Sequence, residues 1–238
     1  MYLVGIDEVG RGALAGPLVV GAVVLDQPIS GLRDSKVLSR KQRSVLNECI
    51  IKSAKFFGLG WVSSKELDAI GLSQALTLAA TRALSNLNLK PIRYILDGNY
   101  NYLSPTHKPF ELVIKGDDLV PSISAASIVA KVARDNYMFQ LDKELPQYGF
   151  KNHVGYGTKE HLNALAHSGA SIEHRKSFEP LKSQLSSDGS SLWVVLGLAR
   201  ARVLARWWFQ WPGLRVEQNW VIGDLERISQ NLAEKLNH

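Results

Sequence analysis

The sequence has few of the features that mark secreted, membrane-spanning or zinc-binding proteins. It contains one cysteine, Cys49, among 238 residues, so no disulfide can form within the chain. No run approaches the ~18 apolar residues of a membrane helix, and the first residues carry no basic leader. The six histidines lack the spacing of a zinc site, and Gly10-Arg11-Gly12 is too short for a phosphate-binding P-loop. We therefore expect a cytoplasmic protein.

Positive charge is present in excess. The formal net charge is +6, which favours a polyanionic partner such as nucleic acid. Hydrophobic residues make up 45% of the chain and charged residues 21%, as is typical of globular proteins. Cys49 falls in an apparent helix, and we expect it to be a small buried hydrophobe and not a nucleophile.

The hydrophobic pattern predicts an α/β fold, with a mixed sheet covered by helices. Short runs rich in β-branched or aromatic residues predict strands at 2–6, 18–25, 56–62, 92–96 and 111–115. Helical spacing and capping signals predict helices after Ser39, over 72–87, from Pro121 towards Leu145, and from Thr158 to a stop at Gly169.

The composition changes near Leu185, which predicts two parts. Residues 186–191 (SSDGSS) are linker-like and separate a domain of residues 1–185 from an extension of residues 186–238. The extension holds five of the six tryptophans together with several arginines. It could pack on the domain as a helix, touch a membrane surface, or stack on nucleic acid.

Acidic residues stand at the ends of three expected strands. Asp7 and Glu8 follow the first strand, Asp97 follows the fourth, and Asp117 and Asp118 follow the fifth. Taken alone, the Asp7-Glu8 pair could lie in a solvated turn, because adjacent acids repel and resist burial. If the first and fourth strands are parallel neighbours, however, their acids converge on one crevice. Such a cluster would suit Mg²⁺ or Mn²⁺, and two ions could activate water against a phosphodiester.

Several motifs, in this order, resemble the ribonuclease HII family over roughly residues 1–182. They are DEVGRG at 7–12, DSK at 34–36, DGN at 97–99, KGD at 115–117, ISAASIVAKVARD at 123–135, PQYGF at 146–150, HVGY at 153–156 and HRKSF at 174–178. The resemblance implies a ribonuclease H-like fold with a five-stranded mixed sheet flanked by helices. It also implies an endonuclease that hydrolyses the RNA strand of RNA/DNA hybrids and cuts 5′ of ribonucleotides embedded in duplex DNA.

The resemblance assigns roles to individual residues. By it, Asp7, Glu8, Asp97 and Asp117 are the catalytic acids and bind Mn²⁺ or Mg²⁺, with two ions expected alongside substrate. Gly10, Arg11 and Gly12 would read the ribose 2′-hydroxyl, and Tyr156 would stack under the deoxyribose that follows it. We further expect substrate contacts from Lys36, Ser124 and Lys131, and phosphate docking on Arg175 and Lys176. No histidine is expected to act as the base, and the protein is expected to be a monomer.

The sequence departs from the family pattern at several places. Gly157 stands where the family usually has proline, which predicts a looser loop after Tyr156 and a weaker preference for single ribonucleotides. Val37 stands where a second lysine is frequent. Asp34 could act in the mechanism or be a turn acid or helix cap. The extension after Leu185 has no counterpart in the resemblance.

Two other functions are compatible with parts of the sequence. A non-catalytic hybrid-binding protein could use the Trp-rich extension, but four clustered acids would weaken binding to phosphates. The related ribonuclease HIII usually carries an N-terminal substrate-binding domain, and the first acid here is already residue 7.

Overall fold

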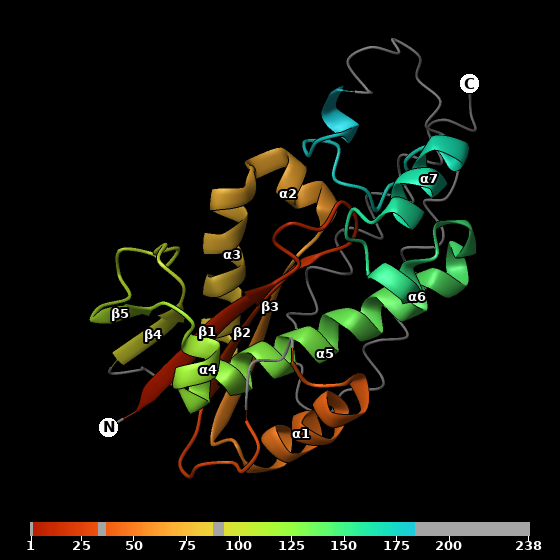
Figure 1. Ribbon diagram of the computed structural model, residues 1–238. Coiled ribbons are helices and arrows are strands. Elements are labelled where there is room, and N and C mark those ends of the chain that lie inside the picture. The colour runs from red at the N-terminus through yellow and green to blue at the C-terminus, as the bar shows by residue number, and fades with distance from the viewer. Residues whose placement is uncertain (1, 33–36, 88–92, 184–238) are drawn as a thin grey trace, which may run out of the picture. The chain divides into compact units, whose positions relative to one another are not determined.

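The computed structural model describes residues 2–32, 37–87 and 93–183 of the protein (Figure 1). The predicted extension of residues 186–238, and also Asp34 and Lys36, lie outside the described residues. None of the helices in the described part combines the length and the apolar character needed to cross a membrane.

A mixed five-stranded sheet forms the centre of the fold, as predicted. Its strands are β1 (Leu3–Val9), β2 (Leu18–Val24), β3 (Phe56–Val62), β4 (Arg93–Asp97) and β5 (Phe110–Val113), in the spatial order β3-β2-β1-β4-β5. The first three strands pair antiparallel, whereas β4 runs parallel to both β1 and β5. The fold is therefore of the α/β class, as expected.

Helices surround this sheet. They are α1 (Arg40–Ser53), α2 (Ser64–Ile70), α3 (Leu72–Ser85), α4 (Gly116–Leu119), α5 (Pro121–Glu144), α6 (Phe150–His153) and α7 (Lys159–Ser168), with a 3-10 turn at Pro146–Tyr148. The four predicted helices are confirmed as α1, α3, α5 and α7. The Ser39 hydroxyl accepts from Gln42 N–H at 3.3 Å and completes a capping box, and Thr158 caps α7, which ends at Gly169. The short helices α2, α4 and α6 were not predicted.

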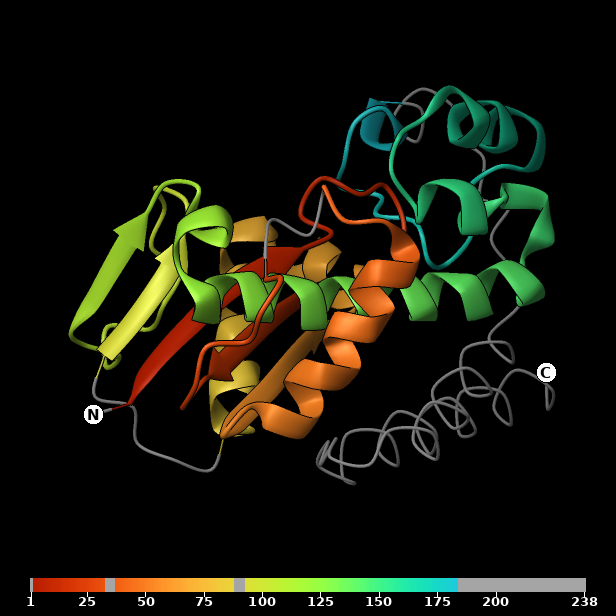
Figure 2. The ribbon, with the colours of Figure 1, turned by 60° about the horizontal axis from the view of Figure 1, so that its bottom comes forward.

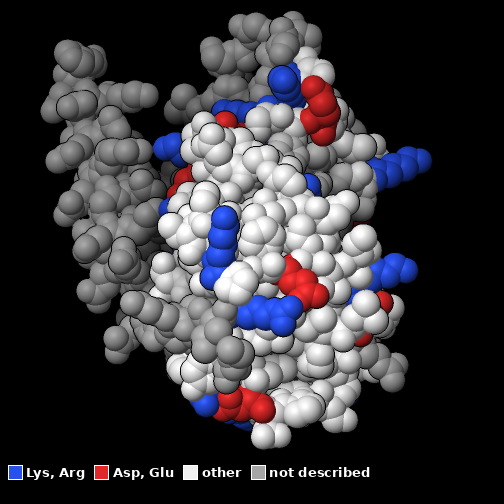
Figure 3. Space-filling view, turned by 90° about the vertical axis from the view of Figure 1, so that its left-hand side faces the viewer, with Lys and Arg blue, Asp and Glu red and all other residues white. Residues whose placement is uncertain are grey.

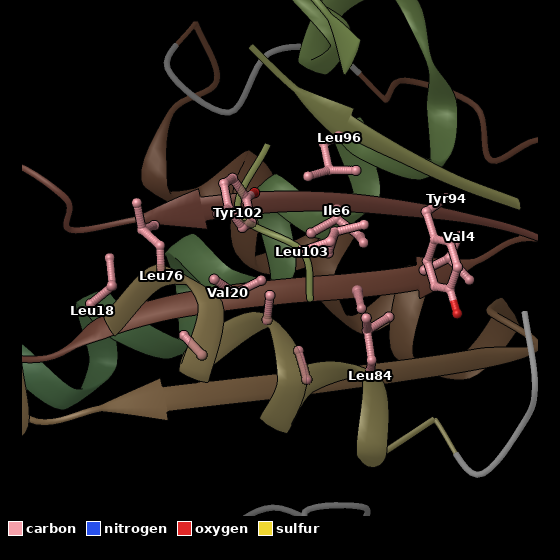
Figure 4. Packing of buried hydrophobic residues seen from close by; sticks show 14 of the residues in the cluster. Val4, Ile6, Leu18, Val20, Leu76, Leu84, Tyr94, Leu96, Tyr102 and Leu103 are labelled. Carbon is pink, nitrogen blue, oxygen red and sulfur yellow. The ribbon is translucent and has the colours of Figure 1, made fainter. Parts of the chain in front are cut away.

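The sheet is covered on both faces, by α3 on one and by α5 on the other (Figures 1 and 2). Because side chains alternate along a strand, Val4 and Ile6 of β1 point to the α3 face. There they join the main apolar core, which Figure 4 shows together with Leu96 of β4 and Tyr102. Gly5 faces α5 instead, since a Cβ placed on it would lie 2.2 Å from Ser122 C.

Three expectations from the sequence were wrong in detail. Asp7 and Glu8 lie inside β1 and not after it, because β1 keeps pairing with β2 as far as Val9↔Val19. Strand β5 ends at Val113, so Asp117 lies in α4. Cys49 is exposed, because the buried face of α1 is formed by Asn47 and Ile50.

Candidate active site

Asp7 and Asp97 lie at the same end of two neighbouring parallel strands. The pairing of β1 with β4 runs through Ile6↔Leu96, so the next residues along the two strands are Asp7 and Asp97. Ile6 and Leu96 both belong to the core on the α3 face. By alternation, Asp7 and Asp97 both belong to the face covered by α5. The topology therefore brings these two carboxylates together, as the sequence predicted for parallel strands.

Asp7 is nearly inaccessible, with 7% of its surface exposed. Burial raises its pKa to about 8; the charges of Glu8 and Asp97 act in the same direction, while a hydrogen bond with the Ser127 hydroxyl opposes them. The backbone N–H of Glu8 donates to Asp7 Oδ1 at 2.7 Å. Asp7 therefore keeps its proton at neutral pH unless a cation or another positive group arrives.

Glu8 points to the opposite face of the sheet from Asp7. Burial raises its pKa, as does the charge of Asp97, while Tyr102 and Arg11 lower it. Arg11 forms an ion pair with it, with Nη1 3.5 Å from Glu8 Oε1, but half of the Arg11 side chain is in solvent. The buried Tyr102 hydroxyl lies beside the Glu8 carboxylate without closing a hydrogen bond of normal geometry, and burial and Glu8 raise its pKa. The negative charge of the Glu8 carboxylate is thus only partly balanced by its neighbours.

Asp117 is joined to Asp97 through the first residue of α4. The N–H of Gly116 donates to Asp97 Oδ1 at 2.7 Å, and a Cβ at Gly116 would lie 3.3 Å from the same oxygen. Asp117 is 4% exposed, whereas its neighbour Asp118 is exposed. Burial beside Asp97 therefore favours Asp117 over Asp118 as the fourth acid.

The chemistry of these donors suits a hard divalent cation, although the ligand set is not preassembled. Burial, and after it the charges of neighbouring acids, raise the pKa values of Asp7 and Glu8, and a bound cation would favour the charged form of both. Within residues 2–32, 37–87 and 93–183, no group of three or more His, Cys, Asp and Glu side chains is arranged to hold a metal ion. Alternation along β1 explains this in part, because Glu8 points to the opposite face of the sheet from Asp7 and Asp97.

The loop between β1 and β2, residues 10–17 and here called the glycine loop, contacts Tyr156. The N–H of Gly10 donates to the Tyr156 hydroxyl at 3.2 Å. Gly10 has a φ of +84°, and a Cβ there would lie 2.3 Å from Arg134 Nε, so only glycine fits. Arg11 and Gly12 are exposed, and a Cβ at Gly12 would meet nothing within 4 Å. The loop therefore presents open backbone beside the acids.

Two fully buried arginines hold this loop in place. Arg134 donates to the carbonyls of Pro17, Ala15 and Val154 at 2.9, 3.1 and 2.9 Å. Arg175 donates to the Gly16 carbonyl at 2.9 and 3.1 Å and to the Arg11 carbonyl at 3.0 Å. The expectation that Arg175 docks phosphates was wrong, because its guanidinium is 0% exposed and bound to backbone. No spacing in the sequence signalled either role.

The remaining predicted substrate residues differ in accessibility. The Lys131 ammonium forms an ion pair with Asp135 at 2.8 Å and lies 6.0 Å from the centre of the Tyr156 ring. Ser124 is buried, and its hydroxyl donates to the carbonyls of Asp117 and Val120, which ties α4 to α5. Lys176 is exposed. Lys131 and Lys176 are therefore better placed than Ser124 to meet a phosphate.

The net positive charge does not gather on the sheet edge that carries β5. On that face, shown in Figure 3, the coloured basic and acidic side chains of the described residues are interspersed among uncharged ones. A polyanion would therefore find no broad patch of one sign among the described residues of this face.

Comparison with known proteins supports the same conclusion as the fold. The family model of ribonuclease HII matches residues 4–180. The chain belongs to the ribonuclease HII family. It is 49% identical over 185 residues to ribonuclease HII of Acidovorax sp. (strain JS42), which covers 77% of this chain and 88% of that protein. For ribonuclease HII of Shewanella loihica, identity is 48% over 190 residues, covering 78% of this chain and 91% of that protein.

Solved structures agree. The ribonuclease H2 from Pyrococcus horikoshii OT3 superposes with a TM-score of 0.66 at 26% identity, covering 77% of this chain and 96% of that one. Bst-RNase HIII, solved in complex with Mn²⁺, superposes with a TM-score of 0.59 at 21% identity over 78% of this chain and 70% of that one, and shows the shared fold. Membership of the ribonuclease HII family makes this protein a hydrolase of the ribonuclease H type; the roles of individual residues stay predictions.

The family's usual proline is absent at Gly157, and the structure shows what occupies its place. Gly157 does not have a positive φ, so the backbone here does not require glycine. A Cβ would lie 3.1 Å from Leu14 Cδ1 in the glycine loop. The turn over residues 156–158 is closed by the Thr158 N–H, which donates to the Tyr156 carbonyl at 2.8 Å. The weaker preference for single ribonucleotides stays a prediction.

Proposed function

We propose that this protein is an endonuclease that hydrolyses the RNA strand of RNA/DNA hybrids and cuts on the 5′ side of ribonucleotides embedded in duplex DNA. The products would be a 3′-hydroxyl and a 5′-phosphate. Residues 1–185 would form the catalytic domain, and residues 186–238 an extension whose role is open. The partners would be RNA/DNA hybrid and ribonucleotide-containing duplex, met by a monomer in the cytoplasm.

One observation carries the proposal: the glycine loop begins directly after the strand that bears Asp7 and Glu8, and it is bonded to Tyr156. The hydrogen bond from Gly10 N–H to the Tyr156 hydroxyl joins the backbone that would read the sugar to an aromatic ring. A ribose 2′-hydroxyl can bond to backbone groups, whereas a flat ring fits the sugar that lacks this hydroxyl. The pair could therefore distinguish an RNA–DNA junction.

Asp7, Glu8, Asp97 and Asp117 would hold Mn²⁺ or Mg²⁺. Two such ions would supply activation of water and stabilisation of the leaving oxygen. Asp7 would give up its proton on binding, because its raised pKa reflects burial beside other acids. The Gly116 N–H keeps the Asp97 carboxylate oriented towards this end of the sheet. The exposed backbone of Arg11 and Gly12 would bind the ribose, and Lys131 would meet a phosphate.

The test is cleavage of two labelled substrates by the full chain, a duplex with a single ribonucleotide and an RNA/DNA hybrid, each with Mg²⁺ or Mn²⁺. Asp97→Asn is expected to lower the rate about a thousand-fold, which corresponds to the several kcal/mol expected of a metal-binding acid. Asp117→Asn and Asp118→Asn form a matched pair, of which only the first should lose activity.

The outcome that contradicts the proposal is equally specific. Wild-type cleavage rates in Asp97→Asn would remove the acids from the mechanism. Tight hybrid binding by the unaltered chain without cleavage in either ion would indicate a binding protein instead.

A further inference from the structure

Three histidines from separate segments lie together beneath the Tyr156 loop. His161 of α7 is 0% exposed, His174 is 1% exposed, and His153 of α6 is 6% exposed. The Nε2 atoms of His161 and His174 lie 3.0 Å apart, and the rings of His153 and His161 stack with centroids 4.5 Å apart. Nothing in the mechanism above uses these rings.

The hydrogen bonds at the far end of this group determine where the protons lie. The backbone N–H of Ser171 lies 2.9 Å from His174 Nδ1 and can only donate, so this nitrogen carries no proton. A neutral His174 must then carry its proton on Nε2 and donate it to His161 Nε2. His161 in turn carries its proton on Nδ1, 3.0 Å from the Tyr156 carbonyl, and donates there.

These groups form one chain of hydrogen bonds, here called the relay. Donation runs in one direction along it, from Ser171 through His174 and His161 to the Tyr156 carbonyl. It requires both rings to be neutral, since a second proton on either would place two N–H groups face to face. Burial lowers the pKa of His161 to about 4 and that of His174 to about 3, so both rings are neutral at physiological pH.

His153 supports the same loop from the other side. The Gly155 N–H donates to His153 Nδ1 at 3.3 Å, which leaves the proton on Nε2, 2.9 Å from the Tyr148 carbonyl. The backbone N–H of Tyr156 also donates to the His153 carbonyl at 2.9 Å. Tyr156 is thus held at its N–H, at its carbonyl and, through Gly10, at its hydroxyl.

We propose that His161 and His174 are positioning residues that set the orientation of Tyr156 against the glycine loop, and thereby the preference for a ribonucleotide–deoxyribonucleotide junction. This rests on the proposed role of Tyr156 in substrate reading. A ring that reads a sugar by shape depends on its placement, because displacements near 1 Å can cost on the order of a hundred-fold in rate. The relay links that placement to residues 171–174, where His174 also pairs with Ala15 of the glycine loop.

A matched pair of substitutions at His161 separates the two ends of its ring. In His161→Asn the side-chain amide N–H occupies the place of Nδ1–H, so donation to Tyr156 is kept and the link to His174 is lost. In His161→Gln the amide oxygen reaches the place of Nε2, so the link to His174 is kept and donation to Tyr156 is lost. His167→Gln, at the exposed histidine of the same helix, is the control.

The readout is the ratio of kcat/KM for the single-ribonucleotide duplex to kcat/KM for the RNA/DNA hybrid. His174 acts on Tyr156 only by fixing the proton of His161 on Nδ1, and the amide N–H of Asn donates without that help. We therefore expect His161→Gln to lower this ratio about tenfold, and His161→Asn and His167→Gln to keep it within about twofold. A ratio unchanged in His161→Gln, or lowered equally in His161→Asn, overturns the relay while leaving the proposed function standing. Failure of the unaltered chain to cut either substrate would contradict the proposed function instead.

The tautomers can be tested in the unaltered protein, which removes any dependence on the folding of variants. Imidazole ¹⁵N chemical shifts at pH 7 should show a protonated Nε2 in His174 and a protonated Nδ1 in His161. The opposite tautomer in either ring, or a doubly protonated ring, would overturn the proposal.

Discussion

Because the Asp7 carboxyl is buried, we expect replacement of this acid by a neutral residue to make the folded protein more stable. The pKa of Asp7 is about 8 in the folded protein, against an ordinary value of 3.8. Between these values the folded chain keeps a proton that the unfolded chain has released, so the free energy of unfolding falls as the pH rises. At about 1.4 kcal/mol per pH unit, the penalty at pH 7 is at most about 4 kcal/mol.

Asp7→Asn removes this penalty, since a neutral amide fills the same space and can accept from Glu8 N–H. Measured by urea denaturation in EDTA, the variant should be more stable than the unaltered chain by up to about 4 kcal/mol at pH 7, and by less than about 2 kcal/mol at pH 5. Other titrating groups, including the histidines, are common to both chains and cancel in this difference.

Addition of Mn²⁺ should then stabilise the unaltered chain and leave Asp7→Asn nearly unchanged, because ligand binding to the folded state adds to its stability. The reasoning is refuted if Asp7→Asn is the less stable chain in EDTA at pH 7, or if its advantage does not shrink towards pH 5.

Three further predictions concern other parts of the fold. His161 and His174 keep lowered pKa values when folded, so their contribution to the free energy of unfolding should fall below pH 6.5, by about 2 kcal/mol for each at pH 5; measured in Asp7→Asn, which lacks the opposing titration of Asp7, a flat urea-stability profile from pH 7 to 5 would contradict this. Gly60→Ala should destabilise by about 3 kcal/mol or more, because its Cβ would lie 1.8 Å from the Ala79 carbonyl oxygen; a thermal midpoint equal to that of the unaltered chain would be the contrary result. Gly12→Ala should keep the stability within about 0.5 kcal/mol yet reduce cleavage at a single ribonucleotide, since its Cβ would point into open space where we propose that the sugar binds; full activity would argue against backbone reading there.

Local patterns predicted the parts of the fold whose energetics are local. The apolar run of β2 and the apolar stripe of α3 depend on periodicity, and the α1 cap depends on two residues three positions apart. The sequence predicts that Asp7 and Asp97 converge only if β1 and β4 are parallel neighbours. The structure shows that they are. Strand β1 is longer than the apolar run that predicted it. Its pairing with β2 continues through Asp7 and Glu8, which hydrophobicity alone would leave out of a strand.

The support beneath the site could not be predicted in the same way. Arg134, Arg175 and His161 act on backbone carbonyls more than a hundred positions away or on rings in other segments, and a carbonyl is the same group at every residue. An arginine next to a lysine in a basic motif, as at Arg175, indicates a surface by composition, and only the fold reveals that it is enclosed. The resemblance to a family predicted the acidic residues of the site, but not the buried residues that support the loop beside them.

The return of residues 171–175 to the glycine loop has a consequence for how the protein is made. Gly16 N–H donates to the Glu173 carbonyl, Arg175 N–H donates to the Leu14 carbonyl, and the Arg175 side chain binds the carbonyls of Gly16 and Arg11. A ribosome that has released only the sheet and α5 has therefore produced every predicted metal-binding acid, but not the contacts that shape the loop beside them. Completion of that loop waits for the emergence of Arg175, so a nascent chain stalled before this point would carry the acids without a finished reading surface.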